Sequence, residues 1–319
     1  MRIVSGSGYT DETIIVEAIP KANCLFRGWY CDASLVSKSS LYEFVMPGND
    51  YQLNALFVTN EQNEWDISHG VVPTYIDNNT ITFGLFPKTH VSDQALISSL
   101  NSLTETAENG WYYFDGEYYV KQAMIKSASE TILSFDDGSR IVEGTYWFKC
   151  EPIEWIAVSS TENGRCFLLS KYLIDANMFF TPNPGVYSDY ETCSLRSWLN
   201  DDFYNSAFYL NKSPIQNSSY NYSSYSLSNA FNDYVVLPKY EELGGGYATK
   251  CVVTEYGRTR GGWYNRVTAS NTGIKSGKYW TSTPYSGYEV VIVSEDGTKW
   301  FSNAKQANIC VRPAIIIDY

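Results

Sequence analysis

The sequence predicts two domains in series, a small all-β domain over residues 1–58 and a larger α+β domain over residues 81–319. The chain has 319 residues, which exceeds a typical single domain and allows two. Apolar residues alternate with a period of two within residues 1–58, whereas helical and strand patterns mix after residue 81. The intervening residues 59–80 are polar and rich in turn formers, so we predict a linker there.

Four short strands are expected in the small domain. In the first strand, Ile14, Val16 and Ala18 fall on one face, with Ile15 and Glu17 on the other. The other three strands are expected at residues 24–30, 42–46 and 53–57. This pattern predicts a compact sheet with one buried face and no chemistry of its own.

Several segments of the small domain carry a resemblance to a known family. These segments are Val16-Glu17-Ala18, Phe26-Arg27-Gly28-Trp29-Tyr30, Phe44-Val45-Met46-Pro47 and Leu53-Asn54-Ala55-Leu56-Phe57. Together they resemble the internalin-type B repeats and their divergent bacterial relatives. The resemblance implies a β-grasp-like module of an extracellular or cell-surface bacterial protein. Residues 1–8 look like the interior of such a repeat, so we expect a piece of a longer protein.

Two helices are expected in the larger domain. Residues 91–103 have apolar side chains at nearly helical spacing after Asp93, which can cap the helix. Residues 191–208 form the second candidate, with Thr192 or Ser194 as the N-cap.

Strands are expected on either side of these helices. Tyr112 to Val120 predicts a hairpin because Asp115-Gly116 at its centre suits a tight turn. Residues 146–159 and 165–170 have the composition of further strands.

Six short motifs of the larger domain occur in the order expected for one family. They are Phe83-Gly84-Leu85-Phe86-Pro87-Lys88-Thr89, Glu151-Pro152-Ile153-Glu154-Trp155, Phe167-Leu168-Leu169-Ser170-Lys171, Ser194-Leu195-Arg196-Ser197-Trp198-Leu199-Asn200, Trp280-Thr281-Ser282-Thr283-Pro284 and Val311-Arg312-Pro313-Ala314. The chain is similar to a bacterial domain family of unknown function. The resemblance implies a C-type-lectin-like fold, related to that of the formylglycine-generating enzyme, without a settled activity.

The charge balance argues against two kinds of partner. The formal net charge is −12, and neither a nucleic acid nor an anionic membrane surface is expected to bind an acidic protein. No apolar run approaches the length of about 20 residues that spans a bilayer, so no membrane insertion is expected. Arg258, Arg260 and Arg266 surround Trp263 and fit an anion clamp, but we favour an exposed loop kept soluble by its arginines.

The sequence predicts no metal, cofactor or catalytic residue. Its seven cysteines include no C-x-x-C pair, and its histidines are His69 and His90. We expect His69 to be a solvated loop residue. Formylglycine-generating chemistry uses a cysteine pair near the C-terminal motif, whereas this chain has Cys310 alone there, so we predict that Cys310 is a core residue.

An enzyme that uses two carboxylates is the alternative. A carbohydrate-active or protein-modifying enzyme needs one suitably spaced pair, and no pair stands out among Glu151, Glu154, Glu191, Asp201 and Asp202. We expect Asp201 and Asp202 on the polar face of the second helix, and Glu154 at an exposed strand position.

The aromatic excess favours a binding function. Aromatic residues make up 16% of the chain, and residues 216–225 consist almost wholly of Ser, Asn and Tyr, a mixture typical of binding loops. A solvated insertion is the other interpretation. The predicted ligand-binding residues are Tyr220, Tyr222, Tyr225, Trp263, Tyr264, Arg258, Tyr285 and Tyr288. The sequence thus predicts a non-catalytic extracellular binding or adhesion module that recognises a glycan, or a host or bacterial surface protein.

Overall fold

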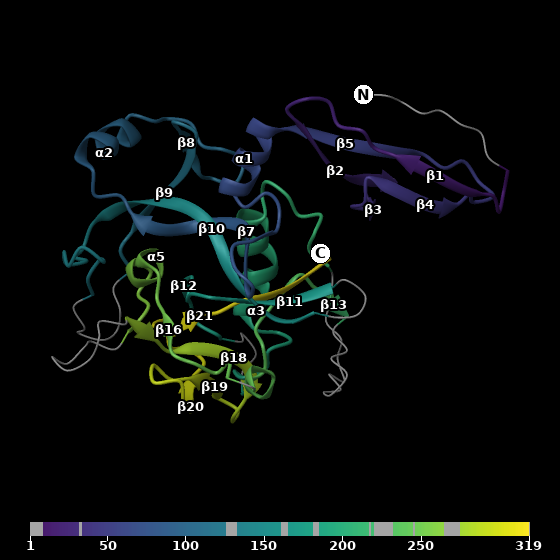
Figure 1. Ribbon diagram of the computed structural model, residues 1–319. Helices are drawn as coiled ribbons and strands as arrows, with labels where there is room; N and C mark the ends of the chain where they lie inside the picture. The colour runs from purple at the N-terminus through teal and green to yellow at the C-terminus, as the bar shows by residue number, and fades with distance from the viewer. Residues whose placement is uncertain are drawn as a thin grey trace. The chain divides into compact units, whose positions relative to one another are not determined.

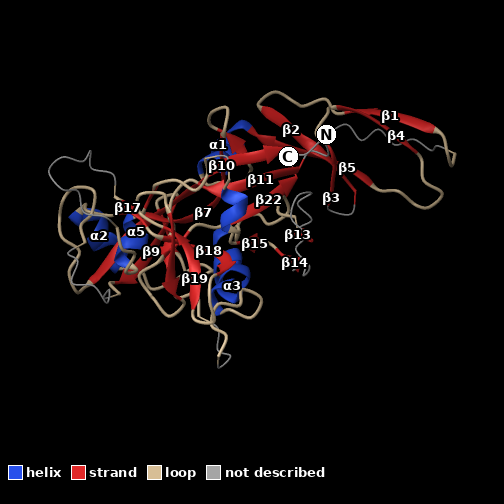
Figure 2. Ribbon diagram, turned by 90° about the horizontal axis from the view of Figure 1, so that it is seen from below, coloured by secondary structure: helices blue, strands red, loops and turns tan. Residues whose placement is uncertain are grey.

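The structure, a computed structural model, describes residues 9–31, 34–125, 133–160, 165–180, 185–216, 218–219, 232–244, 246–264 and 275–318. The chain divides into two compact units, residues 1–68 and 69–319. Strands supply most of the regular structure in each unit (Figures 1 and 2). No helix of the described ranges is long and apolar enough to cross a membrane.

The first unit contains the four expected strands and one more. Strand β1 (Thr13–Glu17) pairs antiparallel with β4 (Leu41–Val45). Strand β2 (Cys24–Cys31) lies between β3 (Ser34–Ser37) and β5 (Leu53–Thr59). Ala18 and Trp29 are buried, and the rings of Phe26 and Trp29 pack edge to face with centroids 5.5 Å apart. The period-two alternation therefore predicted the strands correctly, but they form a two-stranded and a three-stranded sheet rather than the single sheet that was expected.

The predicted linker is not a separate segment in the structure. Helix α1 (Asn60–Ser68) belongs to the first unit, and β6 (Thr74–Tyr75) pairs with β7 in the second. One polar side chain of this stretch is held inside the first unit. Asp66 is buried and accepts hydrogen bonds from the Arg27 guanidinium at 2.9 Å and the Gln62 amide at 2.6 Å.

The second unit is built on an eight-stranded sheet with the order β15-β22-β11-β10-β7-β6, and β9 and β8 extend it beside β10. Its remaining strands are β7 (Thr80–His90), β8 (Tyr112–Phe114), β9 (Glu117–Ala123), β10 (Thr145–Ser160), β11 (Arg165–Ser170), β15 (Val235–Val236) and β22 (Ala314–Asp318). The predicted hairpin is β8–β9, and Asp115 and Gly116 both have positive φ, as a tight turn requires.

A five-stranded sheet with the order β12-β21-β18-β19-β20 completes the second unit. Its strands are β12 (Asp175–Ala176), β18 (Tyr279–Pro284), β19 (Glu289–Val293), β20 (Lys299–Asn303) and β21 (Cys310–Val311). Two short pairs lie outside both sheets, β13 (Ser218–Ser219) with β14 (Asn232–Asp233), and β16 (Cys251–Val252) with β17 (Ser276–Gly277). The unit's main core includes Phe83, Trp155 and Trp280, all fully buried.

The helices are short. Helix α2 (Gln94–Asn101) is capped by Asp93, as predicted, because its carboxylate accepts from Ala95 and Leu96 N–H. Two brief helices, η2 (Tyr240–Leu243) and α5 (Glu255–Thr259), precede β18 in the chain. Strands thus dominate the second unit, and the helical part of the predicted α+β domain is limited to short helices.

The second predicted helix is a composite of α3 (Ser194–Trp198), a π-helical turn η1 (Leu199–Phe203) and α4 (Tyr204–Ala207). The prediction of Thr192 or Ser194 as the N-cap is wrong. Cys193 is the N-cap, and its Sγ accepts a hydrogen bond from Arg196 N–H at 3.3 Å. The Thr192 hydroxyl donates to Asp189, and the Ser194 hydroxyl to the Phe180 carbonyl. Asp201 and Asp202 are exposed, as expected.

Candidate functional site

Residues 304–309, which we call the crossing connection, link two strands of the five-stranded sheet that are not neighbours. Because β18 and β19 lie between β20 and β21, residues 304–309 must cross a face of that sheet to join them. Backbone hydrogen bonds hold this connection at three points. Phe180 N–H donates to Ala304 O at 2.9 Å, Asn177 N–H to Ile309 O at 3.2 Å, and Trp263 N–H to Asn308 O at 3.0 Å.

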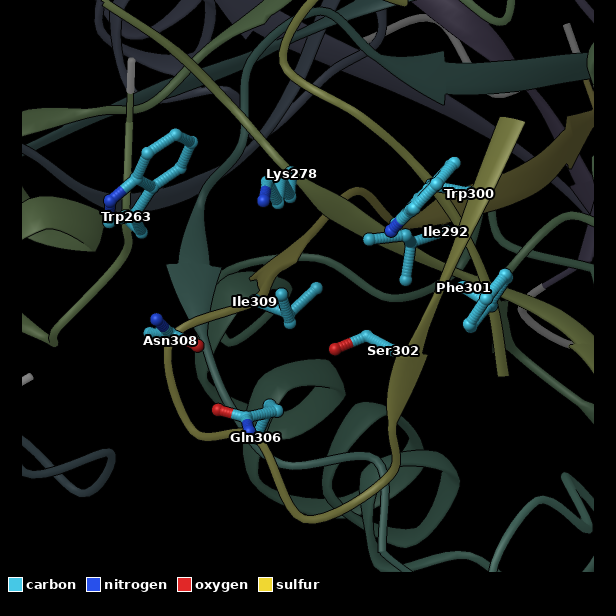
Figure 3. Close-up of a pocket in the computed structure, with 9 residues that line it drawn as sticks. All are labelled: Trp263, Lys278, Ile292, Trp300, Phe301, Ser302, Gln306, Asn308 and Ile309. Carbon is cyan, nitrogen blue, oxygen red and sulfur yellow. The ribbon is translucent and has the colours of Figure 1, made fainter. Parts of the chain in front are cut away.

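A cleft of about 370 Å³ lies between the crossing connection and strands β19 and β20. Its lining comprises Trp263, Lys278, Ile292, Trp300, Phe301, Ser302, Gln306, Asn308 and Ile309. Figure 3 shows Trp263 and Trp300 on opposite sides of the cleft with Lys278 between them. The volume falls within the range of about 300–1,000 Å³ typical of small-ligand sites.

One wall of the cleft is a set of nearly parallel aromatic rings. The side chain of Trp300 is 58% exposed, and its ring lies 5.2 Å from that of Phe301 at an interplanar angle of 9°. The ring of Tyr285 also stacks on Phe301, with the ring centroids 4.4 Å apart and an interplanar angle of 2°. Because these rings already hold one another, Trp300 loses little freedom when a ligand contacts it.

The rest of the cleft lining combines polar groups with the Trp263 ring and two isoleucines. Within the described ranges, the amide groups of Gln306 and Asn308 and the hydroxyl of Ser302 make no side-chain hydrogen bond to the protein. The Lys278 ammonium lies 4.6 Å from the centroid of the Trp263 ring and 3.7 Å from the Glu295 carboxylate. The cleft therefore offers amide, hydroxyl and ammonium groups to a ligand.

The structure brings together part of the predicted binding set. Trp263 lines the cleft, and Tyr285 stacks on Phe301, which also lines it. Tyr288 is 55% exposed but packs on Tyr187, outside the cleft lining. The predicted residues Tyr220, Tyr222 and Tyr225 lie outside the described residues.

Two other predicted residues, Arg258 and Tyr264, lie inside the second unit. Arg258 is 1% exposed, and its guanidinium donates to Ser134 O at 2.6 Å and to the Asp136 carboxylate at 2.8 Å. The Tyr264 hydroxyl accepts from Ser134 N–H at 3.1 Å. These contacts join separate chain segments, so both side chains have a structural role and are not part of the cleft.

The interpretation of the arginine-rich stretch as an exposed, solubilising loop is therefore wrong for its described part. Helix α5 is buried along its whole length. Arg260, which follows α5, pairs with the buried Asp175 at 3.0 Å. Burial raises the pKa of Asp175 above its usual value, although Arg260 opposes that shift. Arg266 lies outside the described residues.

The histidines are packed residues. His69 is 4% exposed, with Nε2 2.9 Å from Gly116 O, so the expectation of a solvated side chain is wrong. The ring of His90 stacks on Phe135 at 3.7 Å, and burial lowers its pKa despite the carboxylates of Glu255 and Asp137. Within the described ranges, no group of three or more His, Cys, Asp or Glu residues could hold a metal ion.

None of the seven cysteines, all of which lie in the described ranges, forms a disulfide bond. Cys310 is fully buried, which confirms its prediction as a core residue, and burial raises the pKa of its thiol well above the usual value. A buried neutral thiol is a poor nucleophile.

Two carboxylates of the alternative prediction, Glu151 and Glu154, belong to a structural ion-pair cluster. Glu154 is half-buried rather than exposed, and it lies 3.0 Å from Lys88 and 2.8 Å from Lys171. Lys88 also lies 3.3 Å from Glu151. The adjacent cavity measures about 20 Å³, enough for water but not for a sugar ring.

This cluster predicts a pH-dependent contribution to stability. Burial alone would raise the pKa of Glu154, but hydrogen bonds from Lys171 and Lys88 outweigh burial, so the pKa lies below its usual value of 4.5. Glu154 therefore stabilises the fold above that pH, and this contribution is lost as the pH falls through the lowered folded-state pKa. Glu154→Gln is expected to cost about 1 kcal/mol at pH 7, and this cost should shrink as the pH falls below 4.5.

Urea unfolding of both proteins at several pH values measures this difference. The exposed Glu191 provides the control, because Glu191→Gln should change stability by less than about 0.5 kcal/mol. A cost for Glu154→Gln that does not change with pH would contradict the assignment.

Sequence reasoning missed most of the cleft. Trp300, Gln306 and Asn308 were not predicted as ligand contacts, yet each lines it. One local signal existed, since adjacent aromatic residues at Trp300-Phe301 interrupt the alternation of a half-buried strand. The amide residues carry no such signal, because their position depends on how the chain crosses the sheet.

Two family models match the chain. One is described as "Divergent InlB B-repeat domain" and matches residues 3–61, which confirms the resemblance of the first domain and indicates a bacterial surface-associated protein. The other, "Domain of unknown function (DUF6273)", matches residues 163–319, which contain the whole cleft. It does not extend to the motifs at Phe83–Thr89 and Glu151–Trp155. Searches of curated proteins and of solved structures found no match.

Proposed function

We propose that the second unit is a saccharide-binding module of a bacterial surface-associated protein, with its binding site in the cleft between Trp263 and Trp300. The supporting observation is an exposed Trp300 ring opposite polar side chains without hydrogen-bond partners in the described ranges. The proposal includes the C-type-lectin-like fold and the extracellular location that the two resemblances imply.

The chemistry of a sugar ring fits both the aromatic rings and the polar groups of the cleft. A pyranose has a face of C–H groups, which suits the electron-rich face of an indole, and an edge of hydroxyl groups, which suits amides and ammonium groups. Trp300 supplies the first kind of contact, and Gln306 and Asn308 supply the second. Both kinds are needed for a ligand that is apolar on one surface and polar on another.

The other candidate functions have less support. A protein partner usually covers about 800 Å² on each side, whereas the cleft is a local hollow. A glycosidase needs two carboxylates about 5–10 Å apart, and none of the nine cleft-lining residues is a carboxylate. The contacts in the cleft therefore favour recognition of a sugar over its hydrolysis.

Trp300→Ala is expected to weaken saccharide binding by about tenfold or more, because Trp300 supplies the exposed aromatic face. A glycan array of the intact 319-residue chain identifies the bound sugars, and calorimetry with those sugars gives the affinities. Trp300→Phe keeps an aromatic face and should retain part of the binding. Tyr113→Ala removes another exposed ring, on β8, and should bind like the unchanged protein.

Absence of binding to every glycan, or unchanged binding by folded Trp300→Ala, would contradict the proposal. A Tyr220/Tyr222/Tyr225→Ala variant on the same array tests the tyrosine-rich stretch. The proposal that these tyrosines contact the ligand requires weaker binding by this variant.

A further inference from the structure

A second group of aromatic rings lies beyond the crossing connection. The ring of Tyr187 is flanked by Phe180 at 5.7 Å and by Tyr288 at 5.3 Å, with interplanar angles of 26° and 30°. Tyr187 N–H donates to Gly287 O at 2.7 Å, which ties this group to the β18–β19 turn. We call Phe180, Tyr187 and Tyr288 the outer platform. Tyr288 is its most exposed ring, at 55%.

The crossing connection joins the outer platform to the cleft. Gln306 lines the cleft, whereas the ammonium of the preceding residue, Lys305, lies 4.4 Å from the Tyr187 ring centroid. Ala304 accepts from Phe180 N–H at 2.9 Å and donates to Tyr288 O at 3.0 Å. Three consecutive residues therefore connect the two places. Ala304 holds the backbone of the outer platform, Lys305 places a cation beside it, and Gln306 lines the cleft.

The backbone of the outer platform is strained. Phe180 has a φ of 25°, a region that L-residues with side chains rarely adopt. Its carbonyl accepts from Ser194 N–H at 2.7 Å and from the Ser194 hydroxyl at 2.9 Å. Strain that is held by its surroundings is frequent at ligand sites, where it fixes the position of a side chain.

Lys305 provides a charge for a ligand at the outer platform. Its side chain is exposed, and no carboxylate of the described ranges lies within 4.0 Å of its ammonium. By contrast, Lys278 in the cleft lies 3.7 Å from Glu295, and Lys299 on β20 lies 3.4 Å from Glu241. In a chain of net charge −12, Lys305 is therefore a cation available to an anionic group beside exposed aromatic rings.

We propose that the outer platform is a second subsite for the same saccharide chain, and that it binds an acidic sugar unit. This inference rests on the proposed function of the cleft. The sugar ring contacts Tyr288, and its carboxylate or phosphate group pairs with Lys305, while a neighbouring unit occupies the cleft beside Trp300. The chain would then distinguish acidic from neutral glycans although its overall charge is negative.

The test compares matched glycans on the intact 319-residue chain. Uronate oligosaccharides are paired with their carboxyl-reduced forms, and phosphorylated oligosaccharides with their dephosphorylated forms, so that the two anionic groups are distinguished. The expected result is an affinity about fivefold higher for the acidic member of at least one pair, decreasing with added salt. Lys305→Gln should abolish this preference and leave binding of the neutral member unchanged.

Lys212→Gln is the matched control. Lys212 is also an exposed lysine over a tyrosine ring, 5.0 Å from the centroid of Tyr204, but its ammonium donates to Asn205 at 2.6 Å. This variant should keep the acidic preference. Tyr288→Ala should weaken binding of longer chains and leave binding of single sugars unchanged.

Each outcome supports or overturns the inference. It is overturned if no pair shows a preference, or if the preference survives in Lys305→Gln. If Trp300→Ala weakens binding of neutral glycans but acidic glycans bind no more tightly than neutral ones, the second subsite is overturned and the proposed function of the cleft stands. If no glycan binds, or if Trp300→Ala binds glycans as tightly as the unchanged protein, the proposed function is contradicted as well.

Discussion

Arg312→Ala is expected to destabilise the second unit by about 3–5 kcal/mol, among the largest effects of any single change. Arg312 is 2% exposed and donates to Ser170 O at 2.9 Å, Tyr247 O at 2.8 Å and the Tyr279 hydroxyl at 2.9 Å. Truncation leaves these acceptors without a donor and opens a cavity where the side chain was packed against the Tyr279 ring.

Urea unfolding followed by circular dichroism measures this loss. Arg312→Lys restores the charge but cannot reproduce the forked donor geometry, so it should recover only part of the stability. Arg140→Ala is the control, because Arg140 is exposed and its truncation should cost less than about 0.5 kcal/mol. Equal stability of Arg312→Ala and Arg140→Ala would contradict the role assigned to Arg312.

Gly84→Ala is expected to cost about 3 kcal/mol, because two penalties coincide at this position. Gly84 has a φ of 74°, and a Cβ added there would lie 2.6 Å from Cε1 of Phe208 and 3.1 Å from Ala207 O. Phe208 is buried and immediately follows α4, so neither the ring nor the backbone can move aside easily. The glycine thus permits the close approach of β7 to the composite helix.

Gly116→Ala separates the two penalties. Gly116 has a φ of 83°, but no atom lies within 4 Å of the added Cβ, so only the backbone penalty of about 1 kcal/mol remains. Thermal and urea unfolding of the two variants should therefore differ by about 2 kcal/mol. The same loss in both variants would show that backbone conformation alone accounts for Gly84.

The local elements were predictable where one short stretch of chain determines them. Asp93 caps α2, and Asp115-Gly116 forms the hairpin turn, because each depends on residues within a few positions. The boundary between the units falls after residue 68, within the predicted stretch 59–80. The burial of Asp66 in that stretch was not predictable, because it depends on Arg27, 39 residues away. The cap by Cys193 was missed because thiols are weak acceptors and rarely chosen for this role.

The candidate site was less predictable than the elements. Composition identified Trp263, which lines the cleft, and Tyr285, which stacks on the cleft-lining Phe301. The same reasoning selected Arg258, which is buried. Arg258 is held inside the unit by hydrogen bonds to Ser134 and Asp136, which lie over 120 residues earlier in the chain. The cleft itself depends on the crossing of residues 304–309 over the sheet, which local patterns do not encode.

The position of β22 has a consequence for synthesis of the protein. This strand lies between β15 and β11, although it is the last of the described strands in the chain. While the ribosome is still translating residues before 314, β11 and β15 each lack a hydrogen-bonding neighbour. The nascent second unit must therefore wait for its final strand, and during that interval its open strand edges are the most vulnerable to aggregation and to capture by chaperones.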